Sequence, residues 1–140
     1  HRALGTAYQS IIRPKLEYAC IIWDPFTQKN VNKLERIQRK AVRYTYSKFR
    51  HTDSPSELIR ANGIELLESR RKTFRLNFLS QLLQRQTALD PTQYLTPIST
   101  RHTRHHHPGT LTPYFARTDA FKFSFFPRTV EEWNLLKDSV

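Results

Sequence analysis

With 140 residues, 38% of them apolar, the chain is long enough for one domain with a modest core, and no apolar run approaches the roughly 20 residues of a membrane span. Its lone cysteine, Cys20, excludes an internal disulfide and a cysteine-rich zinc module. Twenty-three Lys and Arg against twelve Asp and Glu give a formal net charge of +11, which attracts polyanions such as nucleic acid or an acidic membrane surface.

The first 26 residues predict two short helices separated by a proline. Apolar residues recur at helical spacing from Ala3 to Ile12, the pattern of an amphipathic helix. Pro14 is expected to stop or kink that helix, because proline lacks an amide donor and its ring clashes with the preceding turn. It also suits the first position of a second helix. That helix would run to Trp23, since the residue before the proline of the following Asp-Pro pair avoids helical dihedral angles.

The clearest predicted helix extends from Thr27 to about Tyr46. Its apolar residues form one stripe that would pack against the rest of the chain: Val31, Leu34, Ile37, Ala41 and Val42. Its cations follow steps of four, three, four and three, and therefore stack on one face away from that stripe: Lys29, Lys33, Arg36, Lys40 and Arg43, with Arg39 beside them. Glu35 is the only acid in this segment, so little of the positive charge is neutralised within the helix.

Two further helices are predicted before residue 88. Ser54, followed by Pro55 and Glu57, has the sequence of a capping box, and the short helix that it begins would end at Asn62-Gly63. A broad apolar arc predicts a longer helix from about Leu67 to Gln86. The cations of this helix do not form a single column, so we interpret them mostly as solvated surface: Arg70, Arg71, Lys72, Arg75 and Arg85.

From residue 88 to residue 112 the composition shifts to Pro, Ser, Thr and His, which predicts an extended polar loop. The loop contains four histidines: His102, His105, His106 and His107. A zinc site needs three or four ligands that converge from rigid elements, so we expect a solvated loop here and no metal site. An alternative is that the histidines of this loop become protonated at about pH 6 and then contact phosphate.

Residues 113–140 are rich in aromatic side chains. Residues 114–117 and the alternation of Phe121, Phe123 and Phe125 predict short strands or an extended ribbon, and Pro127 is expected to open a terminal helix. Such an aromatic cluster forms core more often than a base-stacking surface. The sequence therefore predicts a mainly α fold: a helical region at 1–87, a polar His- and Pro-rich loop at 88–112, and an aromatic-rich ribbon with a terminal helix at 113–140.

No motif in the chain indicates a catalytic, metal-binding or cofactor-binding site. The sequence has no P-loop, no GxGxxG and no HExxH, so we predict no catalytic residue, no metal and no cofactor. Its one adjacent acidic pair, Glu131-Glu132, is expected in the first turn of a helix. The best functional candidate is the cationic face of residues 27–46, because Lys and Arg bind phosphates without sequence preference. A solvated face with salt-bridge partners, or a surface for an acidic protein, are the alternatives.

Three phrases of the chain follow one another in a specific order. The first runs from Ile12 to Ala19 (IRPKLEYA) and continues with Trp23-Asp24-Pro25, the second from Lys33 to Ala41 (KLERIQRKA), and the third from Phe126 to Val130 (FPRTV) with Trp133-Asn134. They resemble the "RPxLEYA…WDP", "LExxQrrA" and terminal "FFPRTIxxWN" phrases of non-LTR retrotransposon reverse transcriptases. The likeness is closest to elements of the Jockey and chicken-repeat type.

This resemblance implies that the chain is the thumb and post-thumb region of a longer RNA-directed DNA polymerase. A chain that begins at His1 and contains no methionine agrees with that expectation of a fragment. Polymerisation in the family depends on metal-binding aspartates, including a pair in a "YxDD"-like strand. This chain has no Asp-Asp pair, so we expect no polymerase activity from it alone.

In the family, thumb helices grip the template–primer duplex through its backbone. The resemblance therefore implies that the cations between Lys29 and Arg43 bind an RNA or DNA template–primer, with the rest of the parent polymerase as a second partner and no membrane contact. It also implies an intracellular location, in the nucleus or in a cytoplasmic ribonucleoprotein. Two alternatives stay open: an inactive structural remnant with exposed apolar faces, and a helical module that binds an acidic protein.

Overall fold

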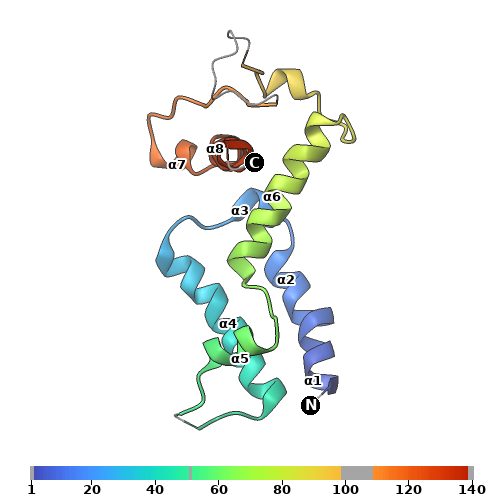
Figure 1. Ribbon diagram of the computed structural model, residues 1–140, viewed down its shortest axis with the longest axis vertical. Coiled ribbons are helices and arrows are strands. Elements are labelled where there is room, and N and C mark those ends of the chain that lie inside the picture. The colour runs from blue at the N-terminus through green and yellow to red at the C-terminus, as the bar shows by residue number, and fades with distance from the viewer. Residues whose placement is uncertain (1, 51, 99–108, 139–140) are drawn as a thin grey trace. The chain divides into compact units, whose positions relative to one another are not determined.

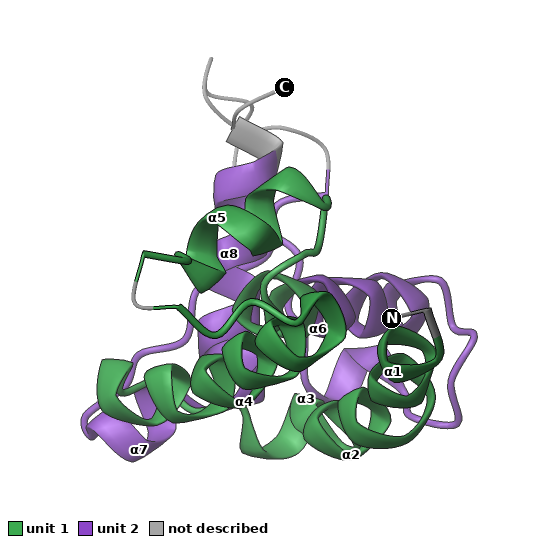
Figure 2. Ribbon diagram, turned by 90° about the horizontal axis from the view of Figure 1, so that it is seen from below, with its two compact units in different colours: residues 1–72 green, residues 73–140 purple. Residues whose placement is uncertain are grey.

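The structure, a computed structural model, describes residues 2–50, 52–98 and 109–138 and is mainly α-helical (Figure 1), which confirms the predicted fold class. It divides into two compact units, residues 1–72 and 73–140, and the division falls within helix α6, Leu67–Leu83 (Figure 2). The predicted segments 1–87, 88–112 and 113–140 are not tested by this division and stay predictions. None of the helices in the described ranges combines the length and the apolar character that a membrane span requires.

The first part of unit 1 is a series of short helices, with a π-helical turn directly before Arg13 and Pro14. It comprises α1 (Arg2–Ala7), a π-helical turn (Tyr8–Ile12), α2 (Arg13–Glu17) and α3 (Cys20–Trp23). The predicted disturbance at Pro14 takes the form of the π-helical turn, in which the Arg13 amide donates to the carbonyl of Tyr8. Pro14 then lies in the first turn of α2. The single helix predicted up to Trp23 is wrong, because Ala19 adopts a left-handed φ of 51° and separates α2 from α3.

Helix α4 (Gln28–Tyr46) is the longest helix of unit 1, and both α1 and α5 (Pro55–Ala61) pack on it. The predicted start of α5 is confirmed: Ser54 Oγ accepts a 3.4 Å hydrogen bond from the Glu57 amide. Its predicted end is also confirmed, because Gly63 has a φ of 61° and the amides of Gly63 and Ile64 donate to the carbonyls of Arg60 and Ile59. This hydrogen-bond pair is a Schellman motif, whose left-handed residue favours glycine.

Unit 2 contains the second part of α6, a 3₁₀ turn (Pro91–Gln93), α7 (Asp119–Lys122) and α8 (Phe125–Asp138). Among its described residues, five buried apolar side chains form the core: Leu79, Leu82, Leu95, Leu111 and Val130. The side chains of Phe125, Phe126 and Trp133 pack against this core, as predicted for the aromatic cluster, whereas Phe121 is largely exposed.

Two expectations for unit 2 are wrong. The short strands or ribbon expected at 121–125 do not form, because residues 121–122 belong to α7. Residues 114–116 form no strand either, and the one β pairing among the described residues is an isolated bridge between Pro97 and Leu111. Thr118 Oγ1 accepts a hydrogen bond from the Phe121 amide and so caps α7, which overrides the alternating phenylalanines. Glu131 and Glu132 lie in the middle of α8 and not in its first turn, because the helix begins before Pro127, at Phe125.

Candidate nucleic-acid interface

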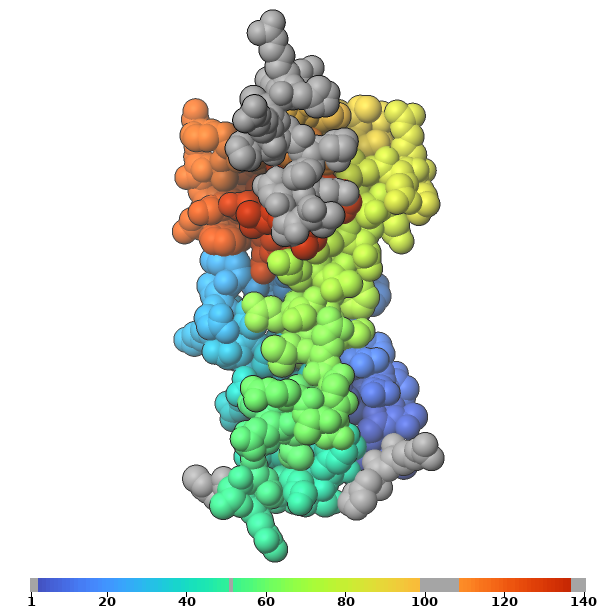
Figure 3. All heavy atoms as spheres, viewed as in Figure 1, coloured from blue at the N-terminus to red at the C-terminus, as the bar shows by residue number. Residues whose placement is uncertain are grey.

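Four of the predicted cations form an exposed row on α4. The side chains of Lys29, Lys33, Arg36 and Lys40 are all exposed, whereas Val31, Gln38 and Val42, on the opposite side of the helix, are buried. At 1.5 Å per residue, the row extends for about 16 Å along the helix axis. In the space-filling view, residues of α4 (light blue to cyan) form part of the molecular surface (Figure 3). We call these four residues the cation row.

The cation row has no acidic partner in the described part of the chain. The ion pairs of unit 1 involve Arg70 and Arg71 instead. Because α4 carries six cations and a single acid, most of its positive charge faces solvent without a nearby counter-charge. Such a surface attracts polyanions over a range of about a Debye length, roughly 8–10 Å at physiological salt.

The two remaining predicted site residues lie differently. Arg43 is half-buried, and one of its Nη atoms donates a 3.4 Å hydrogen bond to the carbonyl of Asp53, in the loop before α5. Arg39 is also half-buried and lines a cavity on the flank of α4. The structure therefore brings together four of the six predicted residues as an open surface and directs the other two toward neighbouring elements.

Gln38 fixes α4 from its buried side. Its side chain is fully buried; its Oε1 accepts a 3.1 Å hydrogen bond from the Tyr8 hydroxyl, and its Nε2 donates a 2.9 Å hydrogen bond to the carbonyl of Glu65. Burial raises the pKa of Tyr8 to about 12, so the phenol stays protonated and keeps donating. One side chain thus connects the N-terminal helical segment, α4 and the chain that leads into α6.

Glu35 is the second buried polar residue of α4. Its Oε1 accepts a 2.8 Å hydrogen bond from the Glu68 amide, in the first turn of α6, where amides lack partners within the helix. A carboxylate also interacts favourably with the positive end of a helix dipole. Burial raises the pKa of Glu35, and the Glu68 amide and Arg71 oppose this rise. The one acid of α4 is therefore used for packing and does not neutralise the cation row.

The arginines of α6 are not the solvated surface that the sequence suggested. Arg71 is fully buried and its Nε lies 2.6 Å from Asp24 Oδ1, while Arg75, 2% exposed, pairs with Glu132 at 3.0 Å. Arg70 is half-buried and pairs with both carboxylate oxygens of Glu17. The sequence did not predict these pairs because Glu17, Asp24 and Glu132 lie 47 to 57 residues from their arginines and leave no helical-spacing signal.

Residues in the three characteristic phrases act mainly as internal connections. Glu17 and Asp24 of the first phrase bind the α6 arginines, and Glu35 and Gln38 of the second hold α4 against its neighbours. Asn134 of the third phrase accepts from the Leu111 amide at 3.0 Å and donates to the Leu111 carbonyl at 2.8 Å. The cation row occupies positions between these packing residues.

The predicted histidine cluster lies outside the described residues. Within the residues that are described, no three His, Cys, Asp or Glu side chains gather as a metal ion would require. Comparison of the chain with protein-family models, with curated proteins and with solved structures gives no match.

Proposed function

We propose that this chain is the non-catalytic thumb and post-thumb region of a non-LTR retrotransposon reverse transcriptase, in which α4 binds the phosphate backbone of the template–primer. The observation that carries the proposal is the cation row: four exposed cations on one face of one helix, with no acidic partner among the described residues. The three sequence phrases support the assignment to this family.

The contrast between α4 and α6 strengthens the case for a binding surface. On α6, Arg70, Arg71 and Arg75 are paired with carboxylates and at least half-buried, so their charge is used within the fold. On α4, by contrast, the four cations of the row form no ion pair with a carboxylate of the described residues. The unneutralised charge of α4 therefore lies on the side of the helix opposite Gln38 and Glu35.

The spacing of the row suits a nucleic-acid backbone. One strand of a duplex advances about 3.4 Å per phosphate along its axis, so a row about 16 Å long covers roughly five phosphates. Side chains of this kind contact phosphate oxygens without reading base edges, so we expect affinity that depends weakly on sequence and strongly on salt. A duplex of RNA and DNA, the product of reverse transcription, is the ligand of choice for a test.

Two variants with equal loss of charge test the proposal. The first changes the row to glutamine (Lys29→Gln, Lys33→Gln, Arg36→Gln and Lys40→Gln), and the second changes four exposed cations elsewhere (Lys15→Gln, Lys72→Gln, Arg117→Gln and Lys122→Gln). Fluorescence anisotropy with a labelled RNA–DNA hybrid gives Kd for each. We expect the row variant to lose about 100-fold in affinity, and the control only a few-fold, because each phosphate contact contributes separately.

Equal losses in the two variants would mean that net charge alone attracts nucleic acid and that α4 is no interface. Absence of binding by the folded wild-type chain would contradict the proposal altogether. In that case the row would be solvated surface or a site for an acidic protein, which a pulldown insensitive to nuclease treatment would identify.

A further inference from the structure

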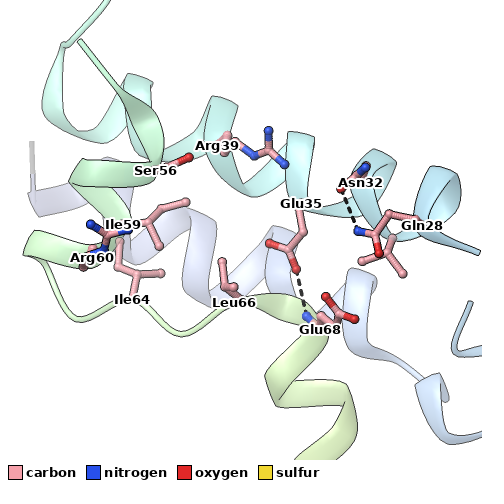
Figure 4. Close-up of a pocket in the computed structure, with 11 residues that line it drawn as sticks. Gln28, Asn32, Glu35, Arg39, Ser56, Ile59, Arg60, Ile64, Leu66 and Glu68 are labelled. Atoms are coloured by element: carbon pink, nitrogen blue, oxygen red, sulfur yellow. Dashed lines mark hydrogen bonds between the residues drawn. The ribbon is translucent and has the colours of Figure 1, made fainter. Parts of the chain in front are cut away.

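A cavity of about 500 Å³ lies on the flank of α4 (Figure 4), within the size range of small-molecule sites. Its wall is formed by residues of α4, α5, the segment between α5 and α6, and the first turn of α6. Apolar side chains, among them Val31, Ile59 and Leu66, form part of the lining. All of these elements belong to unit 1, so the cavity is a feature of one compact unit.

The carboxylate of Glu35 is the unusual feature of this cavity. Glu35 is 6% exposed, and its Oε1 is occupied by the Glu68 amide. Its Oε2 is buried and has no hydrogen-bond donor among the described residues, although a buried acceptor without a donor costs stability. Figure 4 shows the carboxylate directed from α4 toward the lining residues of α5 and of the segment before α6. The cavity thus contains an acceptor that a ligand with an N–H group would satisfy.

Two arginines line the same cavity. Arg39 is half-buried on α4, and Arg60 is exposed on α5; neither has an ion pair with a described carboxylate. A ligand that suits all of these groups is partly apolar, carries an N–H donor for Glu35 and has an anionic group for the arginines. An unpaired nucleotide has this combination, since its base is flat with N–H groups at its edge and its phosphate is anionic.

The position of the cavity relative to the cation row fits such a ligand. Asn32 and Arg39 line the cavity and lie on α4 about 60–100° around the helix from Lys29 and Lys40, at 100° per residue. A strand whose phosphates follow the row therefore passes beside the cavity. A base turned out from that strand reaches the cavity without leaving the surface of α4.

We infer that this cavity binds one unpaired nucleobase with an exocyclic amino group, next to the phosphates held by the cation row. The inference rests on the proposed function, because the row supplies the strand. Glu35 accepts a hydrogen bond from the amino group, as carboxylates do from the N4 amino group of cytosine. Uracil has the same size but presents a carbonyl oxygen at that position, which the carboxylate repels. The site therefore distinguishes cytosine from uracil by chemistry and not by shape.

Glu35→Gln provides a test that a purely structural role would not satisfy. The Glu68 amide requires an acceptor, so the glutamine Oε1 stays on that amide and the new Nε2 donor faces the cavity. A donor at this position favours the carbonyl of uracil over the amino group of cytosine. The substitution should therefore reverse the base preference.

The experiment measures, by fluorescence anisotropy, the affinity for two fluorescein-labelled RNA octamers, C8 (eight cytidines) and U8 (eight uridines). The two octamers have the same phosphate charge. We expect the wild-type chain to bind C8 about tenfold more tightly than U8, the value of one charge-assisted hydrogen bond. Glu35→Gln should bind U8 at least as tightly as C8. Equal binding of C8 and U8 by the wild-type chain, or a preference for C8 retained in Glu35→Gln, would overturn the inference.

A second variant covers the case in which Glu35→Gln does not fold. Ser56→Phe places a bulky side chain in the cavity from α5, and it should reduce C8 affinity to that of U8; an unchanged preference would contradict the inference.

The hybrid duplex separates this inference from the proposed function. Binding of the hybrid without a preference for C8 overturns the base site alone, whereas absence of binding to hybrid and oligonucleotides overturns both.

Discussion

Asp24 Oδ1 lies 2.6 Å from Nε of Arg71, and the two side chains are 6% and 0% exposed. Both Nη atoms of Arg71 are buried and have no hydrogen-bond partner within the described residues. The desolvation of the guanidinium is thus compensated mainly through one ion pair, formed between the Trp-Asp-Pro phrase and α6. Burial of both charges makes each of them dependent on the other.

Loss of Asp24 should destabilise the fold severely. Asp24→Ala leaves a buried cation without its counter-charge, and we expect the free energy of unfolding to fall by about 3–5 kcal/mol, a large part of the stability of a small domain. Urea denaturation followed by circular dichroism measures this. Arg71→Met should cost less in the Asp24→Ala background than in the wild-type chain, because it removes the stranded charge. Additive effects of the two substitutions would show that the pair is not coupled.

Gln38 should contribute more to stability than a polar residue on a helix usually does. Gln38→Leu removes the acceptor of the Tyr8 hydroxyl and the donor to the Glu65 carbonyl, both part of a buried arrangement. We expect a loss of about 2–3 kcal/mol in the free energy of unfolding, against about 1 kcal/mol for Tyr8→Phe, which removes one of the two hydrogen bonds. Equal losses, measured by urea denaturation, would argue against the role of the Glu65 contact.

The raised pKa of Glu35 predicts that the free energy of unfolding depends on pH. Burial raises its pKa above the ordinary value of 4.5, so the folded state binds the proton more tightly than the unfolded state. The associated stabilisation is complete below about pH 4.5 and is lost as the pH rises through the folded-state pKa. Glu35→Gln has no such loss, so its free energy of unfolding relative to wild type should increase between pH 4.5 and pH 7. A relative stability that is constant or decreases over this range would contradict the raised pKa.

In unit 2, Asn134 should control the protection of a single amide. The Leu111 amide donates to Asn134 Oδ1, and the Leu111 carbonyl accepts from Asn134 Nδ2. Asn134→Ala should accelerate hydrogen exchange of the Leu111 amide and reduce stability by about 1–2 kcal/mol. Asn134→Asp keeps the acceptor and should preserve most of the protection. Equally fast exchange in both variants would indicate that the side chain is not the partner that protects this amide.

Local rules predicted much of the helical part of the chain. The limits of α4 and α5 follow from apolar spacing, the Ser54 cap and the left-handed turn at Gly63, all of which are encoded by neighbouring residues. The row of exposed cations on α4 was found for the same reason, because a helix fixes which residues share a face.

Long-range partners could not be predicted in this way. The arginines of α6 look like surface in the sequence, since Glu17, Asp24 and Glu132 are far from them along the chain. Likewise, the row was expected to include Arg43, but the loop before α5 returns past the end of α4 and Asp53 accepts from this arginine. In α7, the capping threonine outweighs an alternation that is typical of strands.

The salt dependence of binding distinguishes a phosphate interface on α4 from a solvated cationic surface. Log K for the RNA–DNA hybrid, measured by anisotropy from about 50 to 300 mM salt, should fall with a slope of about −3 to −4 against log salt, as expected for four neutralised phosphates. The variant without the cation row should have a slope close to zero, and the variant that lacks Lys15, Lys72, Arg117 and Lys122 should keep the wild-type slope. A wild-type slope that survives removal of the row would contradict the assignment of α4 as the nucleic-acid interface.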